Sequence, residues 1–256
     1  MMRRSAAVLL LLVPLLPPCG ALAEEAGAAG VQAEVERHPD DPWERMNRGI
    51  FRFNEGLDRW VLEPVAKGWD WALPDPVQTS VGNFFDNLVF PVRLVNEVLQ
   101  AKPARAYETA WRGVINSVGG LGGLFDVASH YQVYDSDEDF GQTLGYWGTP
   151  AGPYLVLPLF GPSSPRDTVG LAVDSFSQPH AWFVPFYVTF PAATVDLVND
   201  RAAALETIAA ERASAFDFYS FVRSAAIQYR ENQVRDRDPD LPPAADDLYY
   251  FDEDEE

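Results

Sequence analysis

Residues 41–61 read DPWERMNRGIFRFNEGLDRWV, and this stretch carries the clearest helix signal in the chain. Apolar side chains recur every three or four residues, the spacing that places them on one face of an α-helix. That face consists of Trp43, Met46, Ile50, Phe53, Leu57, Trp60 and Val61. A second face carries Arg45, Arg48, Arg52, Glu55 and Arg59. The pattern fits both an ordinary surface helix and a helix lying on an anionic membrane surface.

The start of this helix has the residues of a capping box. Asp41 offers an N-cap acceptor, Pro42 suits the first helical position, and Glu44 stands at the third. The same pattern recurs at Asp75-Pro76 and at Ser164-Pro165.

Helical periodicity continues through most of the chain, whereas alternating strand patterns are nearly absent. The sequence predicts helices over residues 76–88, 91–101, 103–118 and 165–176, and one or two long helices over 192–233. We therefore expect an all-α fold with short connections rich in proline and glycine.

Two windows without any charged side chain are unusual in so acidic a chain. They cover residues 140–165 and 175–195, and prolines interrupt both. A continuous membrane-spanning helix is excluded in each case, because proline breaks helices. The windows indicate either broken apolar segments sunk into one membrane face or a pair of well-buried loops in a soluble core.

The two ends of the chain differ from its body. Residues 1–23 form a signal peptide, with two arginines ahead of an apolar run that is too short to span a bilayer. Because proline precedes Cys19, we expect cleavage after Ala23 instead of lipidation at Cys19, so that the mature chain begins at Glu24. Residues 24–40 read as a flexible linker, 41–234 as the helical domain, and 235–256 as a disordered acidic tail.

Composition excludes several classes of function. The 256 residues carry a formal net charge of -19, which repels phosphate backbones and argues against nucleic-acid binding. One cysteine allows neither an internal disulfide nor a thiolate metal site.

Catalytic frames are also missing from the sequence. The three histidines, His38, His130 and His180, stand in no hydrolase or zinc motif, and the chain has no phosphate-binding loop. The stretch 135–146 starts like a calcium loop, but its glycine falls one position late and Tyr146 stands where a glutamate belongs. We expect a protein that is not an enzyme and holds no cofactor or metal.

Four motifs, in order and with regular spacing, span roughly residues 41–230. They are Asp41-Pro42-x-Glu44-x-x-Asn47-Arg48-x-x-Phe51-x-Phe53-Asn54, Asn116-Ser117-x-Gly119-x-x-Gly122-Gly123-x-x-Asp126-Val127-Ala128, Phe140-Gly141-Gln142-Thr143-Leu144-Gly145, and Gly152-Pro153-Tyr154-x-x-Leu157-Pro158-x-x-Gly161 followed by Arg166-Asp167. Together they closely resemble the MlaA (VacJ) family of outer-membrane phospholipid-transport lipoproteins. The residues before Cys19 depart from the family's lipidation signal.

The resemblance implies a ring-like helical domain embedded in the periplasm-facing inner leaflet of the outer membrane of a Gram-negative bacterium. A central amphipathic channel would remove mislocalised phospholipids from the outer leaflet and pass them to a soluble periplasmic lipid carrier, beside a porin trimer. Lipid asymmetry would thereby be maintained. The alternative is a soluble periplasmic binding or interaction module that does not translocate lipid.

Candidate site residues follow from the same resemblance. It implies that the lipid channel and its gating loop involve Tyr154 and the segment 145–153, in which Gly145, Gly148 and Gly152 should give backbone freedom around Tyr146 and Trp147. Directly after the uncharged window, Arg166 and Asp167 are candidates for a polar edge near lipid headgroups, although Asp167 also suits a helix cap. Taken without the resemblance, residues 145–153 read as a plain turn between two helices. The membrane or structural helix contributes Asn47, Phe51, Phe53 and Asn54. Phe51 and Phe53 lie on different sides of that helix, so we expect one to pack inward and the other to meet lipid.

Overall fold

The computed structural model describes residues 39–133 and 135–236. The order of elements is α1 (Glu44–Leu57), a π-helical turn (Asp58–Leu62), α2 (Glu63–Ala72), α3 (Asp75–Leu99), α4 (Pro103–Val118), α5 (Val127–His130), α6 (Phe140–Tyr146), β1 (Leu155–Leu157), β2 (Gly161–Ser163), α7 (Pro165–Ser177), α8 (Pro179–Phe183), α9 (Phe186–Ala203), α10 (Leu205–Ser214) and α11 (Phe218–Val234). The predicted all-α class is confirmed, with one small hairpin added.

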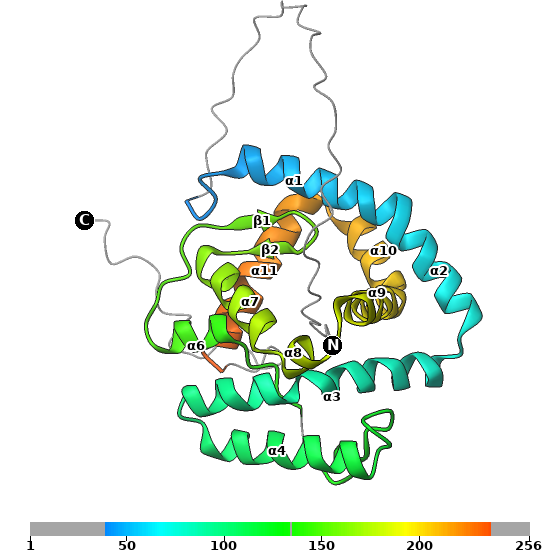
Figure 1. The fold of residues 1–256 in the computed structure, drawn as a ribbon. Helices are drawn as coiled ribbons and strands as arrows, with labels where there is room; N and C mark the ends of the chain where they lie inside the picture. Colours follow the sequence, from blue (N-terminus) through cyan, green and yellow to red (C-terminus); the bar gives the residue numbers. More distant parts are fainter. Residues whose placement is uncertain (1–38, 134, 237–256) are drawn as a thin grey trace, which may run out of the picture.

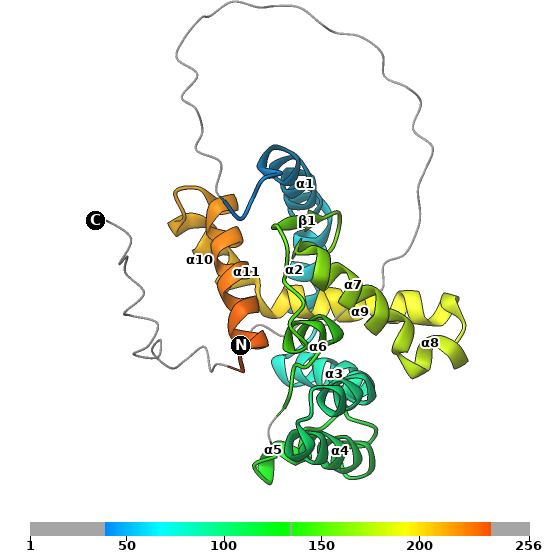
Figure 2. The ribbon, with the colours of Figure 1, turned by 90° about the vertical axis from the view of Figure 1, so that its left-hand side faces the viewer.

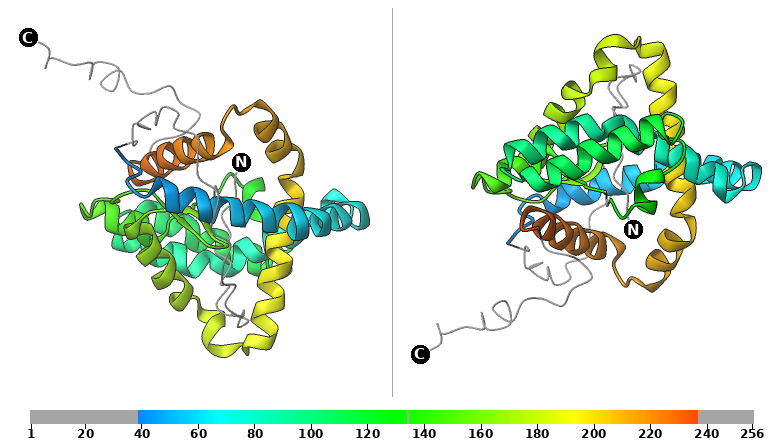
Figure 3. Two further views of the ribbon diagram at one scale, coloured as in Figure 1. Left: turned by 90° about the horizontal axis from the view of Figure 1, so that it is seen from above. Right: turned by 90° about the horizontal axis from the view of Figure 1, so that it is seen from below.

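The elements follow the outline of a ring (Figure 1). In that view α1 and α2 form the upper and right sides, α3 runs along the bottom with α4 outside it, and the hairpin, α6 and α7 close the left side. Seen from the side, α8 and the start of α9 project to one face of the ring, whereas α10 and α11 lie toward the other (Figure 2). Views from above and below repeat this division (Figure 3).

Two helix predictions were wrong in their boundaries. Residues 76–88 and 91–101 form the single helix α3, which runs through Pro91. The helix survives the loss of one backbone donor because α3 packs tightly on α4 beside the proline, where the ring of Phe90 occupies the space that a Cβ on Gly113 would need. Residues 192–233 contain parts of three helices, and the first begins earlier, at Phe186.

Only one of the three predicted caps is confirmed. The Ser164 hydroxyl accepts a hydrogen bond from the Asp167 backbone N–H at 3.1 Å, as an N-cap should. Asp75 is instead the first residue of α3, and its side chain caps nothing. Helix α1 begins at Glu44 without a side-chain cap, because the Asp41 carboxylate is used by tertiary contacts.

The uncharged window 140–165 contains the only strands in the described residues, which the sequence analysis did not foresee. Strands β1 and β2 are antiparallel, with Leu155 opposite Ser163 and Leu157 opposite Gly161. Three residues per strand are too few for alternation to appear in a sequence. The second window, 175–195, is mainly helical, and Pro191 lies inside α9 instead of interrupting it.

The polarity of the described part is the reverse of that in most soluble proteins. Its apolar core is small: Tyr154, Val156 and Tyr219 form the buried cluster. Polar and charged side chains make up most of the other buried residues. Large apolar side chains lie outside, including Trp60 at 82%, Trp71 at 89% and Phe183 at 86% exposure.

Candidate functional site

Two asparagines on α1 clamp the β-hairpin to the helix. The Asn47 side chain donates to the Tyr154 carbonyl at 3.0 Å and accepts from the Val156 N–H at 3.0 Å. Asn54 repeats the arrangement, donating to Leu157 at 2.9 Å and accepting from Leu159 at 2.8 Å. Residues seven apart lie on one helical face, so both carboxamides reach the hairpin. They bind its backbone N–H and C=O groups in the way that a neighbouring β-strand would.

The segment before α1 is fastened by a buried charge. The Asp41 carboxylate accepts hydrogen bonds from Asn47 at 2.8 Å and from the Tyr219 hydroxyl at 2.5 Å. Arg223 on α11 lies 3.2 Å from the same carboxylate and compensates its charge. Because Asp41 is fully buried, its contacts with Asn47, Tyr219 and Arg223 hold the segment before α1 against both α1 and α11.

Phe51 and Phe53 point in different directions. Phe51 packs inward, with its ring centroid 5.4 Å from that of Tyr219 and 5.8 Å from that of Phe218. Phe53 is 58% exposed. The prediction that the two separate is therefore confirmed in geometry, whereas a contact between Phe53 and lipid stays a prediction.

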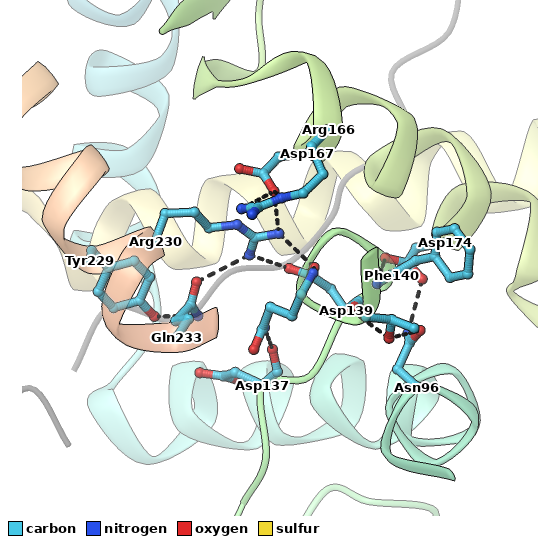
Figure 4. Close-up of polar contacts among 12 residues, drawn as sticks. Asn96, Asp137, Asp139, Phe140, Arg166, Asp167, Asp174, Tyr229, Arg230 and Gln233 are labelled. Carbon is cyan, nitrogen blue, oxygen red and sulfur yellow. Dashed lines mark hydrogen bonds and ion pairs between the residues drawn. The ribbon is translucent and has the colours of Figure 1, made fainter. Parts of the chain in front are cut away.

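Arg166 and Asp167 belong to a buried ion-pair cluster that joins α6, α7 and α11 (Figure 4). Arg230 on α11 contacts both carboxylate oxygens of Asp139, at 2.6 and 2.7 Å, and Asp167 at 2.9 Å. Arg166 in turn contacts Asp167 at 3.0 Å. Burial alone would lower the pKa of Arg230, but the carboxylates of Asp139 and Asp167 raise it above its ordinary value.

A second buried carboxylate lies at the same junction. Asp174 on α7 accepts hydrogen bonds from the Phe140 N–H at 2.9 Å and from the Asn96 side chain at 3.1 Å (Figure 4). Among the described residues, no arginine or lysine forms a hydrogen bond or ion pair with it. Burial raises the pKa of Asp174 to about 6, against the effect of these two hydrogen bonds.

Asp174 should make the stability of the protein depend on pH. The pKa of Asp174 is higher in the folded than in the unfolded state, so protonation of this carboxyl group stabilises the fold. The stabilisation is fully present below about pH 4 and is lost as the pH rises through about 6. Between those limits the wild type should lose up to about 3 kcal/mol relative to an Asp174→Asn variant. Denaturant unfolding of both proteins in detergent at several pH values measures this difference. Parallel profiles for the two proteins would contradict the assignment.

The segment predicted to form a gating loop is only partly a loop. Gly145 and Tyr146 belong to α6, and a Cβ on Gly145 would lie 2.7 Å from Val234 and 2.9 Å from Arg166. Gly145 therefore allows close packing and does not serve as a flexible end, contrary to the expectation. Gly148 and Gly152 do require glycine, because their φ angles are +87° and +76°.

Trp147 ties this loop to the neighbouring helix pair. Its Nε1 donates to the Leu99 carbonyl at the end of α3, at 3.1 Å, although the ring itself is more than half exposed. The loop then leads through Gly152 to Tyr154, which is buried in the small core. The structure thus brings Tyr154 close to Asn47, whereas Tyr146, Trp147 and Gly148 lie at the surface.

Beside the hairpin lies an open apolar groove. It is lined by Trp43, directly before α1, by Met46 of α1, and by Leu155, Pro165 and Thr168, around a volume of about 450 Å³. The groove continues the exposed apolar surface of α1. Exposed aromatic and aliphatic side chains elsewhere include Phe176, Trp182, Phe186, Tyr187, Tyr107, Trp111 and Val118.

The acidic stretch that begins like a calcium loop is engaged by arginine. Arg93 lies 2.9 Å from Asp135 and 3.6 Å from Asp137, and Asp139 pairs with Arg230. Within the described ranges, no group of three or more acidic, histidine or cysteine side chains is arranged to hold a metal ion. None of the described helices combines the length and apolar character that a transmembrane span requires.

Sequence reasoning missed several residues that hold the site together. Arg230, Asp174 and Arg223 were not singled out, and Asp139 was noted only within the stretch that starts like a calcium loop, because their partners lie far away along the chain. The only available signal was the position of Arg230 and Arg223, seven residues apart in one predicted helix. Cys19 and the predicted mature start at Glu24 lie outside the described residues.

Fold and site together define a class of all-helical ring proteins with ion pairs and amide clamps inside and large apolar side chains outside. A family model described as MlaA lipoprotein matches residues 39–233. The chain belongs to the MlaA lipoprotein family.

Individual relatives agree with this assignment. Two are described as intermembrane phospholipid transport system lipoprotein MlaA: one from Haemophilus influenzae, 38% identical over 58% of each chain, and one from Escherichia coli K12, 33% identical over 73% of this chain and 76% of the relative. The uncharacterized protein RT0044 of Rickettsia typhi is 32% identical over 76% of this chain and 78% of its own length.

A solved structure has the same fold. It superposes with a TM-score of 0.68 at 32% sequence identity and covers 76% of this chain and 98% of its own. That structure is described as the structural basis for maintenance of bacterial outer membrane lipid asymmetry.

Proposed function

We propose that this protein is the outer-membrane component of a phospholipid transport system. It removes mislocalised phospholipids from the outer leaflet and hands them to a soluble periplasmic carrier, so that lipid asymmetry is maintained. Membership of the MlaA lipoprotein family and the description of two relatives as parts of an intermembrane phospholipid transport system support this function. So does the similarity to a structure described in terms of outer-membrane lipid asymmetry.

The observation that supports the proposal most strongly is the reversed polarity of the molecule. Among the described residues, Trp60, Trp71 and Phe183 are almost fully exposed, while polar side chains such as Asn47 and Glu97 are fully buried. Such a surface is costly in water but favourable against hydrocarbon, because each methylene removed from water contributes about 0.8 kcal/mol. The ring is accordingly proposed to sit in the periplasm-facing leaflet of the outer membrane of a Gram-negative bacterium.

Moving a phospholipid between leaflets needs a path and no bond chemistry. A charged headgroup cannot cross hydrocarbon cheaply, and acyl chains cannot cross water cheaply. A channel through the ring with polar and apolar walls lowers both costs. The protein therefore acts as a conduit and not as an enzyme, and its proposed partners are phospholipids, a porin trimer and the periplasmic carrier.

Within this function, the loop after α6 is proposed to control lipid passage. Gly148 and Gly152 hold it in a conformation that residues with a Cβ rarely adopt. Trp147 fixes its start to α3, while Tyr146 at the end of α6 and the buried Tyr154 flank it on either side. Arg166 and Asp167 would form a polar edge of the lipid path through their ion-pair cluster.

Changing both glycines should impair lipid removal. In a Gly148→Val, Gly152→Val variant the positive φ angles become strained, and the side chain at 152 also meets Pro165, which would lie 3.3 Å from its Cβ. Gly68→Val is the matched control, since nothing lies within 4 Å of its Cβ. The measurement is outer-leaflet phospholipid in cells that depend on this protein. Wild-type asymmetry at normal protein level would reduce the loop to a connector.

Two measurements test the function itself. Cells that lack their own member of this family should accumulate phospholipid in the outer leaflet, and expression of this chain should reverse the accumulation. Protein purified in mild detergent should also carry phospholipid detectable by mass spectrometry. Failure to restore asymmetry, together with a monodisperse detergent-free protein absent from washed outer membranes, would instead assign a soluble periplasmic binding module.

A further inference from the structure

Almost every cationic side chain in the described residues is paired with a carboxylate. Arg48, Arg93 and Arg230 are examples, each with an acidic oxygen within 3 Å. Arg45 and Arg52 are exceptions: both are exposed on α1, and neither has an ion pair or hydrogen bond through its side chain in the described part of the chain. With 38 acidic residues and 19 basic ones, the protein has enough carboxylates to pair every arginine, so two unpaired arginines on one helix are available to bind an anion from outside the chain.

The two arginines occupy equivalent positions. At about 100° per residue, side chains seven positions apart lie roughly 20° from each other around the helix, so Arg45 and Arg52 form one stripe. Each is followed by an exposed apolar residue, Met46 after Arg45 and Phe53 after Arg52. The pattern continues in the π-helical turn, where Trp60 follows Arg59.

The neighbours of α1 show which way the basic side and the apolar side of this helix face. Arg48 contacts Asp217 at the start of α11, so the basic side of the helix faces the part of the ring that carries α10 and α11. Met46 lines the groove shared with Pro165 of α7, so the apolar side faces the part that carries α7 and α8 (Figure 2). The α8 end displays the exposed Trp182 and Phe183. The arginine stripe therefore runs along the boundary between an apolar side and a polar side.

We propose that Arg45 and Arg52 bind the phosphate groups of anionic phospholipids at the surface of the leaflet. Met46 and Phe53 then lie among the acyl chains just below, and the long arginine side chains reach back to the headgroup level. Charge complementarity favours this occupant, because unpaired guanidinium groups gain most from an anionic surface and form bidentate hydrogen bonds with phosphate. The inference rests on the proposed function and adds to it the headgroup charge that α1 recognises.

Vesicle flotation of the full mature chain tests the proposal. The vesicles contain phosphatidylcholine alone, or about three parts phosphatidylcholine to one part phosphatidylglycerol. The Arg45→Gln, Arg52→Gln double variant should bind the anionic vesicles roughly 30-fold more weakly than the wild type. Binding to phosphatidylcholine alone should not change. Added salt should reduce the difference, because it screens exposed charges.

Three controls define the result. The Arg45→Lys, Arg52→Lys variant keeps the charge and should retain most of the anionic preference. Arg235→Gln removes another arginine that is exposed and unpaired in the described residues, at the end of α11, and should have no effect. Circular dichroism should show equal helix content for all variants, because neither Arg45 nor Arg52 has a side-chain hydrogen bond or ion pair with another described residue.

The outcomes separate this inference from the proposed function. Equal binding of wild type and double variant to anionic vesicles, with binding retained, would overturn the role of the arginines and leave the lipid-transport proposal standing. Failure of the wild type to bind any vesicle would count against both. Unchanged vesicle binding with loss of a co-purified membrane protein would assign the stripe to a protein partner and overturn the lipid assignment.

Discussion

An Arg230→Met variant is expected to lose roughly 3 kcal/mol of unfolding free energy, a large part of the stability of an ordinary domain. Arg230 is buried and joins α11 to Asp139, directly before α6, and to Asp167 of α7. Removing the guanidinium takes this arginine away from Asp139 and leaves Arg166 as the cation beside Asp167, so that two neighbouring carboxylates then share one counter-charge. Denaturant unfolding in detergent, followed by circular dichroism, measures the loss.

The source of this loss can be checked with two further variants. Arg235→Met removes an exposed, unpaired arginine near the same helix end, and its stability should stay within about 0.5 kcal/mol of the wild type. Adding Asp139→Asn to Arg230→Met should recover part of the stability, because the carboxylate that Arg230 paired with is then removed while Asp167 keeps Arg166. A double variant that is less stable than Arg230→Met would show that lost packing, and not lost charge, explains the effect.

An Asn47→Ala variant is expected to cost about 3 to 4 kcal/mol, because each buried polar group left without a partner costs about 1–3 kcal/mol. The substitution strips the Tyr154 carbonyl, the Val156 N–H and the Asp41 carboxylate of one hydrogen bond each. All of these contacts lie in the interior, so water cannot replace the missing amide. The hairpin should also separate from α1, and lipid removal should fall together with stability.

Asn54→Ala is the matched comparison for Asn47. It removes an equivalent pair of hydrogen bonds to the hairpin, but at a partly buried position and without any contact to Asp41. Its cost should be about half that of Asn47→Ala, because water can reach the freed groups. Equal losses for the two variants would contradict the special role assigned here to the buried Asp41 contact. Hydrogen exchange at Val156 and Leu159 would show which end of the hairpin opens.

Helix positions could be predicted where local rules act alone. The helix over residues 103–118 is confirmed to its last residue, since Pro103 suits a helix start and the glycines after Val118 end it. The helix that follows Ser164 begins as predicted because its cap is satisfied within four residues. Pro91 and Asp41 were misjudged because tertiary contacts outweighed the local rule: the adjacent Phe90 packs against Gly113 in one case, and Asp41 binds Tyr219 in the other.

The candidate site could be predicted only in part. The resemblance directed attention to Asn47, Asn54 and Tyr154, and the structure brings these residues together around the hairpin. Their mode of action could not be derived, since each asparagine bonds to backbone more than a hundred positions away. The residues of the loop keep their proposed role in lipid passage, but Gly145, expected to give the loop backbone freedom, lies at a close-packed position of α6.

By itself, the sequence determined the helical class, the family and the presence of long uncharged windows in an acidic chain, because periodicity, motif spacing and composition are local properties. Only the tertiary structure decided that the apolar residues face outward while aspartates and arginines face one another inside. Ion pairs and asparagine–backbone hydrogen bonds join residues that are 63 positions apart for Arg230 and Asp167, 107 for Asn47 and Tyr154, and 182 for Arg223 and Asp41. Such pairings depend on how whole helices pack, since a charged or amide side chain has many possible partners in the sequence and finds one in the fold.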